Sequence, residues 1–353
     1  YAMKTVFVAM SGGIDSSFAA YLLKREGFKV IGITFQLLPN HTSTINNSKT
    51  CCSNEAVLRA KKAADTMNIP HYVIDLRKEF EEFVIERFIK EYGAGRTPNP
   101  CVLCNQFIKF SAFFYKALAL GGDYIATGHY AKIEKMSDTY FLSKATDKSK
   151  DQSYFLYSIK KDQLSRILLP LGVYTKSEII PAIREMGWKN TSMYKESQDL
   201  CFIPNGQYRS FLSNFMRLEK GPIFSIKGKL MGHHDGIHLY TIGQRRGLNI
   251  PYKEPLYVIE IRPHENCLIV GSKNHLMRKS LTATPTNLLS DISSGITAKV
   301  RSRQKEQPCS YSLKDDFMRV EFYECIDAIT PGQSVVLYNE DVVVGGGIIK
   351  SSE

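Results

Sequence analysis

Short apolar runs alternate with longer segments of helical periodicity over the first 130 residues. The apolar runs are short, unbroken and partly β-branched, as buried strands are, and they fall at 5–10, 30–35, 71–75 and 124–126. Amphipathic spacing and end signals predict helices at 18–26, from a Ser53 cap to about 67, at 80–92 and at 106–120. This alternation predicts an α/β fold with a doubly wound parallel sheet. The polar stretch at 40–50 is expected to be a loop.

The pattern changes after about residue 205, where glycines and short alternating segments become frequent. From about residue 271 short strands and turns follow one another, and 335–338 and 342–349 read as a hairpin around Asn339-Glu340-Asp341. We therefore expect three parts: an α/β domain over 1–204, a small central domain over 205–270 and a C-terminal β-barrel over 271–353.

The first strand and helix enclose the segment Ser11-Gly12-Gly13-Ile14-Asp15-Ser16-Ser17. Glycines in such a strand-to-helix turn admit positive φ and let a phosphate approach the backbone, and the free amides at the helix start attract anions. The serine hydroxyls could donate hydrogen bonds, and Asp15 could orient a donor or a metal ion. No Gly-Lys-Ser/Thr ending follows, so the segment is not a Walker loop. It resembles the PP-loop of the ATP pyrophosphatase superfamily, whose members split ATP between the α and β phosphates. A generic Gly/Ser turn is the weaker alternative, because strand, loop and helix agree.

Composition limits the class of protein. The 353 residues are 43% hydrophobic, which suffices for real cores, and contain no 18-residue apolar run that would span a membrane. No signal peptide is evident before the first strand, so a cytoplasmic protein is expected. Eight cysteines in a chain of this length indicate thiols, metal ligands or redox groups rather than a disulfide scaffold.

The net charge of +11 favours a polyanionic partner, and its location is informative. Between residues 273 and 305 seven Lys or Arg accompany one acid. Lys299, Arg301, Arg303 and Lys305 alternate with other residues, which on a strand would put all four cations on one face about 6.6 Å apart. This predicts a stripe that follows nucleic-acid phosphates, the alternative being an ordinary solvated face.

A second candidate site is the cysteine pair in residues 95–105. Two prolines precede Cys101-Val102-Leu103-Cys104, and a thiol near a helix N-terminus is a candidate nucleophile. Cys201 adds a third thiol. The pair alone allows zinc, dithiol redox chemistry or an iron–sulfur site, although zinc would want a matching second pair. The other cysteines are expected to be structural, with the last three as small buried hydrophobes: Cys51, Cys52, Cys267, Cys309 and Cys325.

Several motifs in order resemble those of the bacterial tRNA-specific 2-thiouridylases: SGGIDSS, AGRTPNPCVLCNQFIKF, ATGHY, KDQSYFL, SQDLCFIP, YTIGQRRGL and TPGQSVVLYN. The resemblance covers nearly the whole chain. It implies a PP-loop domain, a small central domain and a C-terminal β-barrel. It also implies an ATP-dependent tRNA-uridine 2-sulfurtransferase that replaces the 2-oxygen of the wobble uridine with sulfur.

The same resemblance implies roles for individual residues. Cys104 would be the nucleophile and Cys201 would carry the persulfide. The ATP site would be lined by Ala9, Met10, Ser11, Gly12, Gly13, Ile14, Asp15, Ser16, Ser17, Phe35 and Gly128. The tRNA would be met by Asn99, Pro100, Cys101, His129, Lys150, Asp151, Gln152, Arg301, Ser302, Arg303 and Gln333. Mg²⁺ is expected with ATP, and the expected partners are tRNA and a sulfur donor such as a cysteine desulfurase or a sulfur-relay protein. We expect a monomer with no membrane partner.

One position departs from the family pattern. Many relatives have Asp, the proposed general acid/base, where this chain has Cys101. Either Cys101 transfers the proton, or Cys101, Cys104 and Cys201 hold three irons of a [4Fe-4S] cluster whose fourth iron takes sulfide. Two other function classes explain less. A different PP-loop ligase would not explain the cysteine pair and the third thiol. A non-catalytic RNA- or metal-binding protein would not explain the phosphate-binding character of residues 11–17.

Overall fold

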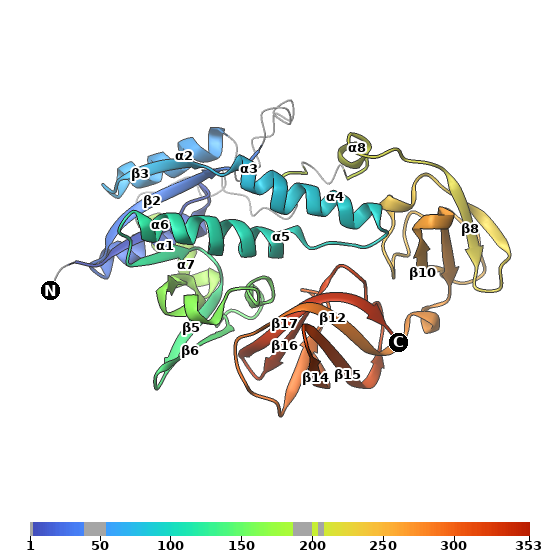
Figure 1. The fold of residues 1–353 in the computed structure, drawn as a ribbon. Helices are drawn as coiled ribbons and strands as arrows, with labels where there is room; N and C mark the ends of the chain where they lie inside the picture. The colour runs from blue at the N-terminus through green and yellow to red at the C-terminus, as the bar shows by residue number, and fades with distance from the viewer. Residues whose placement is uncertain (1–2, 39–53, 186–199, 204–207) are drawn as a thin grey trace. The chain divides into compact units, whose positions relative to one another are not determined.

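The computed structural model describes residues 3–38, 54–185, 200–203 and 208–353 (Figure 1). They form two compact units. The first comprises Tyr1–Ile85, Pro100–Gly206 and Asp341–Val343, and the second comprises Glu86–Asn99, Gln207–Glu340 and Val344–Glu353. The loop expected at 40–50 and the Ser53 cap lie outside the described residues.

The first unit contains a parallel sheet of five described strands in the order β3-β2-β1-β4-β7. The strands are β1 (Thr5–Ala9), β2 (Lys29–Gln36), β3 (His71–Asp75), β4 (Tyr124–Thr127) and β7 (Ile167–Leu168). Four of them were predicted from apolar runs. The two-residue β7 was not, because it is too short to leave a periodic signal.

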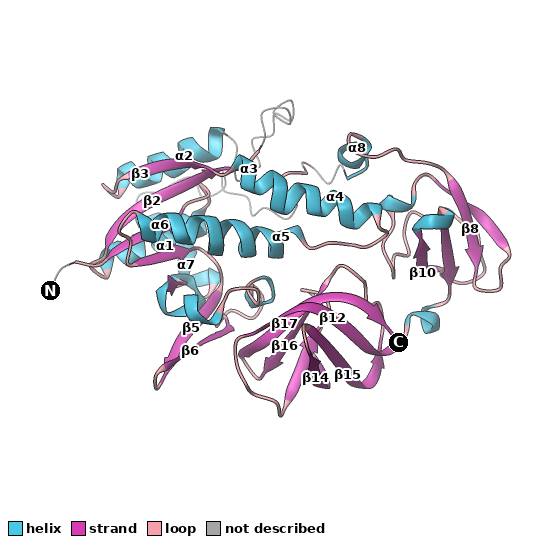
Figure 2. Ribbon diagram, viewed as in Figure 1, coloured by secondary structure: helices cyan, strands magenta, loops and turns pink. Residues whose placement is uncertain are grey.

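Helices cover both faces of this sheet (Figure 2). On one face α1 (Ile14–Arg25) and α2 (Asn54–Thr66) pack with Val6 and Val8 of β1 in one buried cluster. Phe7 lies between those valines in sequence and points to the opposite face, where its ring approaches Gly122 just after α6 (Phe114–Ala119). The doubly wound α/β fold predicted from the sequence is therefore confirmed.

Two helical runs are each built from three consecutive helices. The first follows the predicted 80–92 segment as α3 (Arg77–Phe80), η2 (Glu81–Ile85) and α4 (Glu86–Gly93). The second continues through α5 (Pro100–Leu103), η3 (Cys104–Phe113) and α6. It begins at Pro100 rather than at the predicted residue 106, because proline is well suited to the first turn of a helix. Both η2 and η3 are π-helical, a form often found at functional sites.

A further buried cluster of the first unit lies along α1. It joins Ile14 and Phe18 of α1 with Tyr130, Leu171 of η6 (Pro170–Val173) and Ile179 of α7 (Lys176–Glu185). The other elements of this unit are β5 (Ala131–Met136), β6 (Thr139–Lys144), η4 (Ser153–Phe155) and η5 (Lys161–Arg166).

The longest segment of the second unit, Gln207–Glu340, contains a four-stranded sheet in the order β10-β11-β8-β9. Ile223, Val258, Leu268 and Val270 of this sheet are buried in one cluster with Ile237. The elements are α8 (Tyr208–Ser213), β8 (Gly221–Ser225), β9 (Leu230–His234), η9 (Ile237–Leu239), β10 (Tyr257–Arg262), η10 (Pro263–Glu265), β11 (Cys267–Gly271) and η11 (Lys273–Leu276).

The C-terminal residues form the expected β-barrel. Six strands follow one another in the order β12-β15-β14-β13-β16-β17, and pairing of β12 with β17 closes the ring. The strands are β12 (Arg278–Leu288), β13 (Ile296–Lys299), β14 (Gln307–Lys314), β15 (Phe317–Ile326), β16 (Ser334–Asn339) and β17 (Val342–Ser352), so the predicted final hairpin is confirmed.

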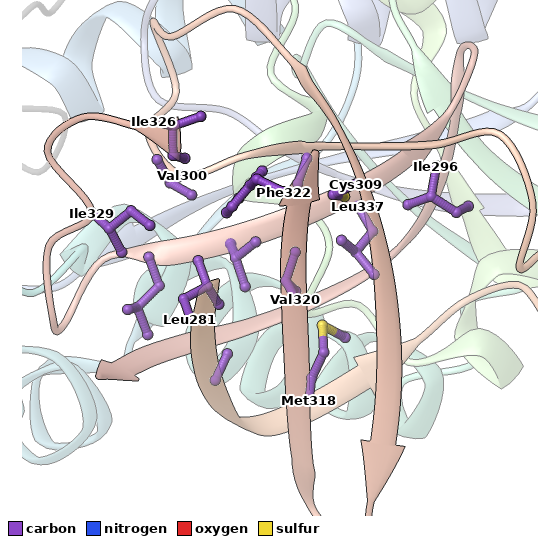
Figure 3. Close-up of a cluster of buried hydrophobic side chains, with 14 of the residues drawn as sticks. Leu281, Ile296, Val300, Cys309, Met318, Val320, Phe322, Ile326, Ile329 and Leu337 are labelled. Carbon is purple, nitrogen blue, oxygen red and sulfur yellow. The ribbon is translucent and has the colours of Figure 1, made fainter. Parts of the chain in front are cut away.

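Aliphatic side chains fill the barrel together with Met318, Phe322 and the thiol of Cys309 (Figure 3). Cys309 lies in this core and Cys267 is buried in the neighbouring sheet, as expected for small hydrophobes. Cys325 is exposed near the end of β15, so the expectation that it is buried was wrong. Strand periodicity does not determine which face of a short strand is covered.

Within the described ranges, every helix is too short or too polar to cross a lipid bilayer.

Candidate active site

The segment after β1 is shaped by two close backbone approaches. Gly12 has a φ of +73°, and a Cβ there would lie 2.3 Å from the Ala56 carbonyl oxygen of α2. At Gly128, just after β4, a Cβ would lie 2.7 Å from the Ser16 nitrogen. Both positions therefore need glycine: Gly12 brings the turn against the first turn of α2, and Gly128 brings the loop after β4 against the start of α1. Gly12 and Gly128 come from the ends of adjacent strands, where α/β sheets bind their ligands.

The first backbone hydrogen bond of α1 runs from Ser17 N–H to Gly13 O at 3.2 Å. The N–H groups from Gly13 to Ser16 therefore have no acceptor within the helix. They face the turn, as the N–H groups do at helix starts that bind anions. Ser16 holds the turn itself: its Oγ donates to Gly13 O at 3.1 Å and accepts from Ser11 N–H at 3.1 Å. Only part of the expected hydroxyl donation is thus available to a ligand. Ser11 is exposed, whereas Ser16 and Ser17 are buried.

Asp15, in the first turn of α1, is engaged by two side chains. Lys176 Nζ lies 2.5 Å from its Oδ1, and the Tyr130 hydroxyl donates to the same oxygen at 2.8 Å. The ammonium also lies 5.7 Å from the centre of the Tyr130 ring. A cation thus stands beside the phosphate-shaped turn and is held by a carboxylate that a ligand could displace.

Sequence reasoning missed Lys176. A signal was present, because Thr175 and Glu178 form a capping pair in which Glu178 accepts from the Thr175 amide at 2.7 Å. That pair places Lys176 at the first position of α7, where the helix dipole opposes a positive charge. The Asp15 carboxylate offsets this unfavourable interaction.

The other residues expected to line the nucleotide site follow the same edge of the sheet. Ala9 ends β1 and Met10 is buried directly after it. Phe35, near the end of β2, is buried with its ring centre 5.0 Å from that of Phe113. Ile14 begins α1 and belongs to the cluster of that helix.

The cysteines occupy the start of the second helical run. Cys101 is exposed in α5, and Cys104, the fifth residue of the run, is half-buried. Cys201 is half-buried in its own described segment. Burial raises the pKa of Cys309 to about 12 and raises that of Cys267, so those two thiols are poor nucleophiles at neutral pH.

Aromatic contacts bring the Cys104 and Cys201 segments to one helix. Phe202, next to Cys201, packs edge-on against Phe80 with ring centres 5.8 Å apart. Phe107, three residues after Cys104, stacks on Phe83 at 5.0 Å. Phe80 ends α3 and Phe83 lies in η2 directly after it, so both cysteine segments pack against one continuous helical run.

The three cysteines do not have the arrangement of cluster ligands. Across residues 3–38, 54–185, 200–203 and 208–353, no group of three or more His, Cys, Asp or Glu side chains is placed to hold a metal ion. Cys101, Cys104 and Cys201 all belong to these ranges, so they do not fit a [4Fe-4S] cluster in this conformation.

His129 was expected to face tRNA, but it is buried. Its Nε2 lies 3.2 Å from Lys109 Nζ, and its Nδ1 lies 2.7 Å from Thr127 Oγ1. Burial, and then the charge of Lys109, hold the pKa of His129 well below its usual range. The imidazole is therefore neutral, with Nε2 accepting from Lys109, and it orients that lysine.

Residues 150–152 were also expected to meet tRNA. Lys150 is half-buried, and its N–H donates to Asp147 O at 3.1 Å. Asp151 accepts from the amides of Ala145 and Ser153 at 3.0 and 3.3 Å. Gln152 accepts from the Tyr130 amide at 2.9 Å. The side chains of Asp151 and Gln152 thus hold the fold of this segment.

The predicted basic strand face is wrong. β13 ends at Lys299, so Arg301, Arg303 and Lys305 do not continue it. Arg301 is half-buried and donates to the Ile242 carbonyl oxygen at 2.9 Å and to Thr330 Oγ1 at 2.6 Å. Ser302, Arg303 and Lys305 are exposed in the turn that follows.

Gln333 contacts the chain just before the cysteine pair. Its Nε2 donates to Thr97 O at 2.9 Å and to Pro98 O at 3.3 Å. The neighbouring Gly332, with φ of +91°, leaves no room for a Cβ beside Thr97. These contacts fix residues 97–98, directly before Asn99, within the second unit.

Three family models match the chain. They are the tRNA methyl transferase HUP domain over residues 4–205, the tRNA methyl transferase PRC-barrel domain over 209–272 and the aminomethyltransferase β-barrel domain over 278–349. Among curated relatives, tRNA-specific 2-thiouridylase MnmA 1 of Clostridium botulinum is 42% identical over 354 residues, covering 98% of this chain and 99% of the relative. The chain belongs to the tRNA-specific 2-thiouridylase family.

A second 2-thiouridylase, MnmA of Clostridioides difficile, is 42% identical over 358 residues, or 99% of both chains. Membership in the 2-thiouridylase family confirms the resemblance drawn from the motifs, and the HUP match contains residues 11–17, Cys104 and Cys201. A solved 4-thiouridine synthetase–RNA complex with bound ATP aligns at 17% identity and a TM-score of 0.38, covering 60% of this chain and 50% of that one, which is too weak to carry an argument.

Proposed function

We propose that this protein is an ATP-dependent tRNA-uridine 2-sulfurtransferase that replaces the 2-oxygen of the wobble uridine with sulfur. The observation that carries the proposal is that one compact unit holds both a turn shaped for phosphate and the Cys104 and Cys201 segments. The full-length similarity to proteins named tRNA-specific 2-thiouridylases supports it.

The first step activates the uridine. Its 2-oxygen attacks the α-phosphate of ATP, pyrophosphate leaves, and the oxygen becomes part of an adenylate whose leaving group is AMP. The amides from Gly13 to Ser16 would receive phosphate oxygens, and Lys176 would turn from Asp15 to the phosphates as charge develops. Mg²⁺ would neutralise pyrophosphate charge, and the carboxylate that the turn itself offers is Asp15.

The second step delivers sulfur. A persulfide on Cys201, loaded by a cysteine desulfurase or a sulfur-relay protein, attacks C2 of the adenylate and AMP leaves. The Cys104 thiolate then attacks the Cys201 sulfur, releases 2-thiouridine and forms a Cys104–Cys201 disulfide, which an external thiol must reduce before the next turnover. The phenylalanine contacts through Phe80 and Phe83 support this pairing, because they join both cysteine segments to one helical run. Cys101, exposed beside Cys104, is proposed to transfer the proton.

The central and barrel residues are proposed to hold the tRNA, with the target base leaving the anticodon stack. An open cavity of about 610 Å³ supports this part of the proposal. Arg245, Tyr252 and Lys253 line it, which combines an exposed aromatic ring with two cations. Such a set suits a single-stranded nucleotide, through stacking and phosphate contact. Exposed Arg303 is a further proposed phosphate contact. We propose a cytoplasmic monomer with the domain limits 1–204, 205–270 and 271–353.

Cysteine variants test the proposal. With ATP, tRNA and a persulfide donor, Cys104→Ser and Cys201→Ser should each abolish 2-thiouridine while tRNA-dependent pyrophosphate release continues. Cys325→Ser is the matched control, because Cys325 is an exposed thiol of the barrel, and it should keep full thiolation. Nucleoside analysis by mass spectrometry measures the product. Normal thiolation by Cys104→Ser would refute the disulfide-exchange step. Pyrophosphate release that does not depend on tRNA would refute the proposal that tRNA is the substrate.

A further inference from the structure

Asn105, next to the proposed nucleophile, is buried without being fully satisfied. Its side chain lies in η3 and the residue is only 2% exposed. Nδ2 donates to the Phe155 carbonyl oxygen at 2.9 Å, but Oδ1 has no hydrogen-bond partner in the part of the chain that the structure describes. A buried acceptor left unpaired costs roughly 1–3 kcal/mol. Stability alone therefore does not explain an asparagine here, and its single donated bond needs another reason.

The acceptor of that bond belongs to a segment that also reaches the nucleotide side. Phe155 N–H donates to Gln152 O at 2.9 Å. Gln152 pairs with Tyr130 in both directions, since its side chain accepts from the Tyr130 amide at 2.9 Å and its own N–H donates to Tyr130 O at 2.8 Å. Tyr130 in turn donates from its hydroxyl to Asp15. Hydrogen bonds between successive residues thus connect Asp15, Tyr130, Gln152, Phe155 and Asn105 in that order.

The same segment is braced from within. The Asp151 carboxylate accepts from the Ser153 hydroxyl at 2.8 Å and from the Ala145 amide at 3.0 Å, and Ser153 is completely buried. A turn held by side chain and backbone together keeps one geometry. Residues 151–155 therefore form a rigid frame with Tyr130 on one side and the Cys104 helix on the other.

We propose that Asn105 is a positioning residue for Cys104, and that residues 151–155 set where this thiol stands relative to the nucleotide-binding turn. The proposal rests on the proposed function, in which Cys104 is the thiol that attacks. Asn105 touches no substrate. It fixes the rotation of η3 at the residue after Cys104 by tying it to Phe155 O. Misplacing a reacting atom by about 1 Å can cost about 100-fold in rate, so one such bond can govern sulfur release.

The test compares two buried side-chain amides, each of which anchors η3 to a neighbouring segment. Asn105→Ala and Asn105→Leu each remove the donor without adding a charge beside Cys104, and Leu keeps a similar size. Gln163→Ala is the matched control, because Gln163 is 3% exposed and donates from Nε2 to Phe110 O of the same η3 at 2.9 Å, six residues from Cys104. Each full-length variant is alkylated with iodoacetamide across a pH series, and modification of Cys104 is followed by peptide fragmentation. Thiolated tRNA and pyrophosphate are measured in parallel.

We expect both Asn105 variants to change the limiting alkylation rate or the apparent pKa of Cys104, with thiolation falling about 10- to 100-fold and pyrophosphate release staying within about threefold. Gln163→Ala should lower the unfolding temperature without changing Cys104 reactivity. Wild-type Cys104 reactivity in Asn105→Leu would overturn the proposal, as would an equal change in Gln163→Ala. If Asn105→Ala does not fold, Asn105→Leu decides. If the wild-type protein makes no 2-thiouridine, the proposed function fails, and the alkylation comparison still judges the positioning of Cys104.

Discussion

Gly128→Ala tests the nucleotide-binding turn by adding one methyl group where the fold leaves no space. The added Cβ would stand 2.7 Å from Ser16 N, 2.8 Å from Asp15 C and 2.9 Å from Ser16 Cα, whereas ordinary contact begins at 3.4 Å. All three neighbours are backbone atoms of α1, so no side-chain rotation relieves the overlap. The turn and the loop after β4 must therefore separate by about half an ångström or more.

That separation has two consequences of different size. Overpacking of this kind costs about 1–3 kcal/mol of folding free energy, which the domain should survive. The amides from Gly13 to Ser16 would move with the turn, and displacement of a positioned group can cost about 100-fold in rate. We therefore expect tRNA-dependent pyrophosphate release to fall about 10- to 100-fold, with weaker binding of a non-hydrolysable ATP analogue.

The assay pairs pyrophosphate release with calorimetric binding of the analogue and with thermal unfolding. Gly93→Ala is the control, because nothing lies within 4 Å of a Cβ at that position. It should keep normal values in all three measurements. Wild-type pyrophosphate kinetics in Gly128→Ala would refute the placement of the phosphates at the start of α1.

Four further outcomes follow from the structure. Lys176→Met keeps the length of the side chain but removes the cation beside the turn, and should slow pyrophosphate release about 100-fold. Cys101→Asp supplies a carboxylate that can transfer a proton and should keep thiolation within a few-fold, whereas Cys101→Ala should lower it, as nucleoside analysis would show. Tyr252→Ala should weaken tRNA binding about 5- to 100-fold in a salt-controlled titration without changing ATP affinity. Burial lowers the pKa of His129 and His234, so the folded protein binds fewer protons than the unfolded chain. The contribution of these histidines to the free energy of unfolding should therefore be fully present above about pH 6.5. Below that pH the free energy of unfolding should decrease by at most about 1.4 kcal/mol per pH unit for each histidine. A free energy of unfolding that stays constant from about pH 6.5 to about pH 5 would contradict this.

The fold was largely predictable, because its signals are local. Apolar runs located four strands of the sheet, and Gly27, with φ of +86°, ends the first helix as expected. The start of the second helical run was misplaced by six residues. Prolines suggested an extended loop up to the cysteine pair, yet Pro100 itself begins α5. A proline favours the first turn of a helix as readily as a loop, so its presence alone does not determine where a helix begins.

The candidate site was predictable only where one segment carries the chemistry. Residues 11–17 were recognisable because strand, glycines and helix are consecutive. Lys176 was not, because it meets Asp15 across 161 residues of sequence. The internal use of the Ser16 hydroxyl and of the Asp151 carboxylate was equally hidden, since a polar side chain looks alike in sequence whether it serves a ligand or its own turn.

The failure of the basic stripe has the same origin and changes how tRNA variants should be interpreted. Alternation of charge assumes a continuous strand with one solvated face, but Lys299 ends β13 and pairs with Glu306 at 3.6 Å. Arg301 is used within the second unit, where its guanidinium joins Ile242 to Thr330. Replacing it would leave buried acceptors without a donor and loosen the region between the central sheet and the barrel. Loss of tRNA binding in an Arg301 variant would therefore not identify a phosphate contact, whereas the same loss in a variant of exposed Arg303 would.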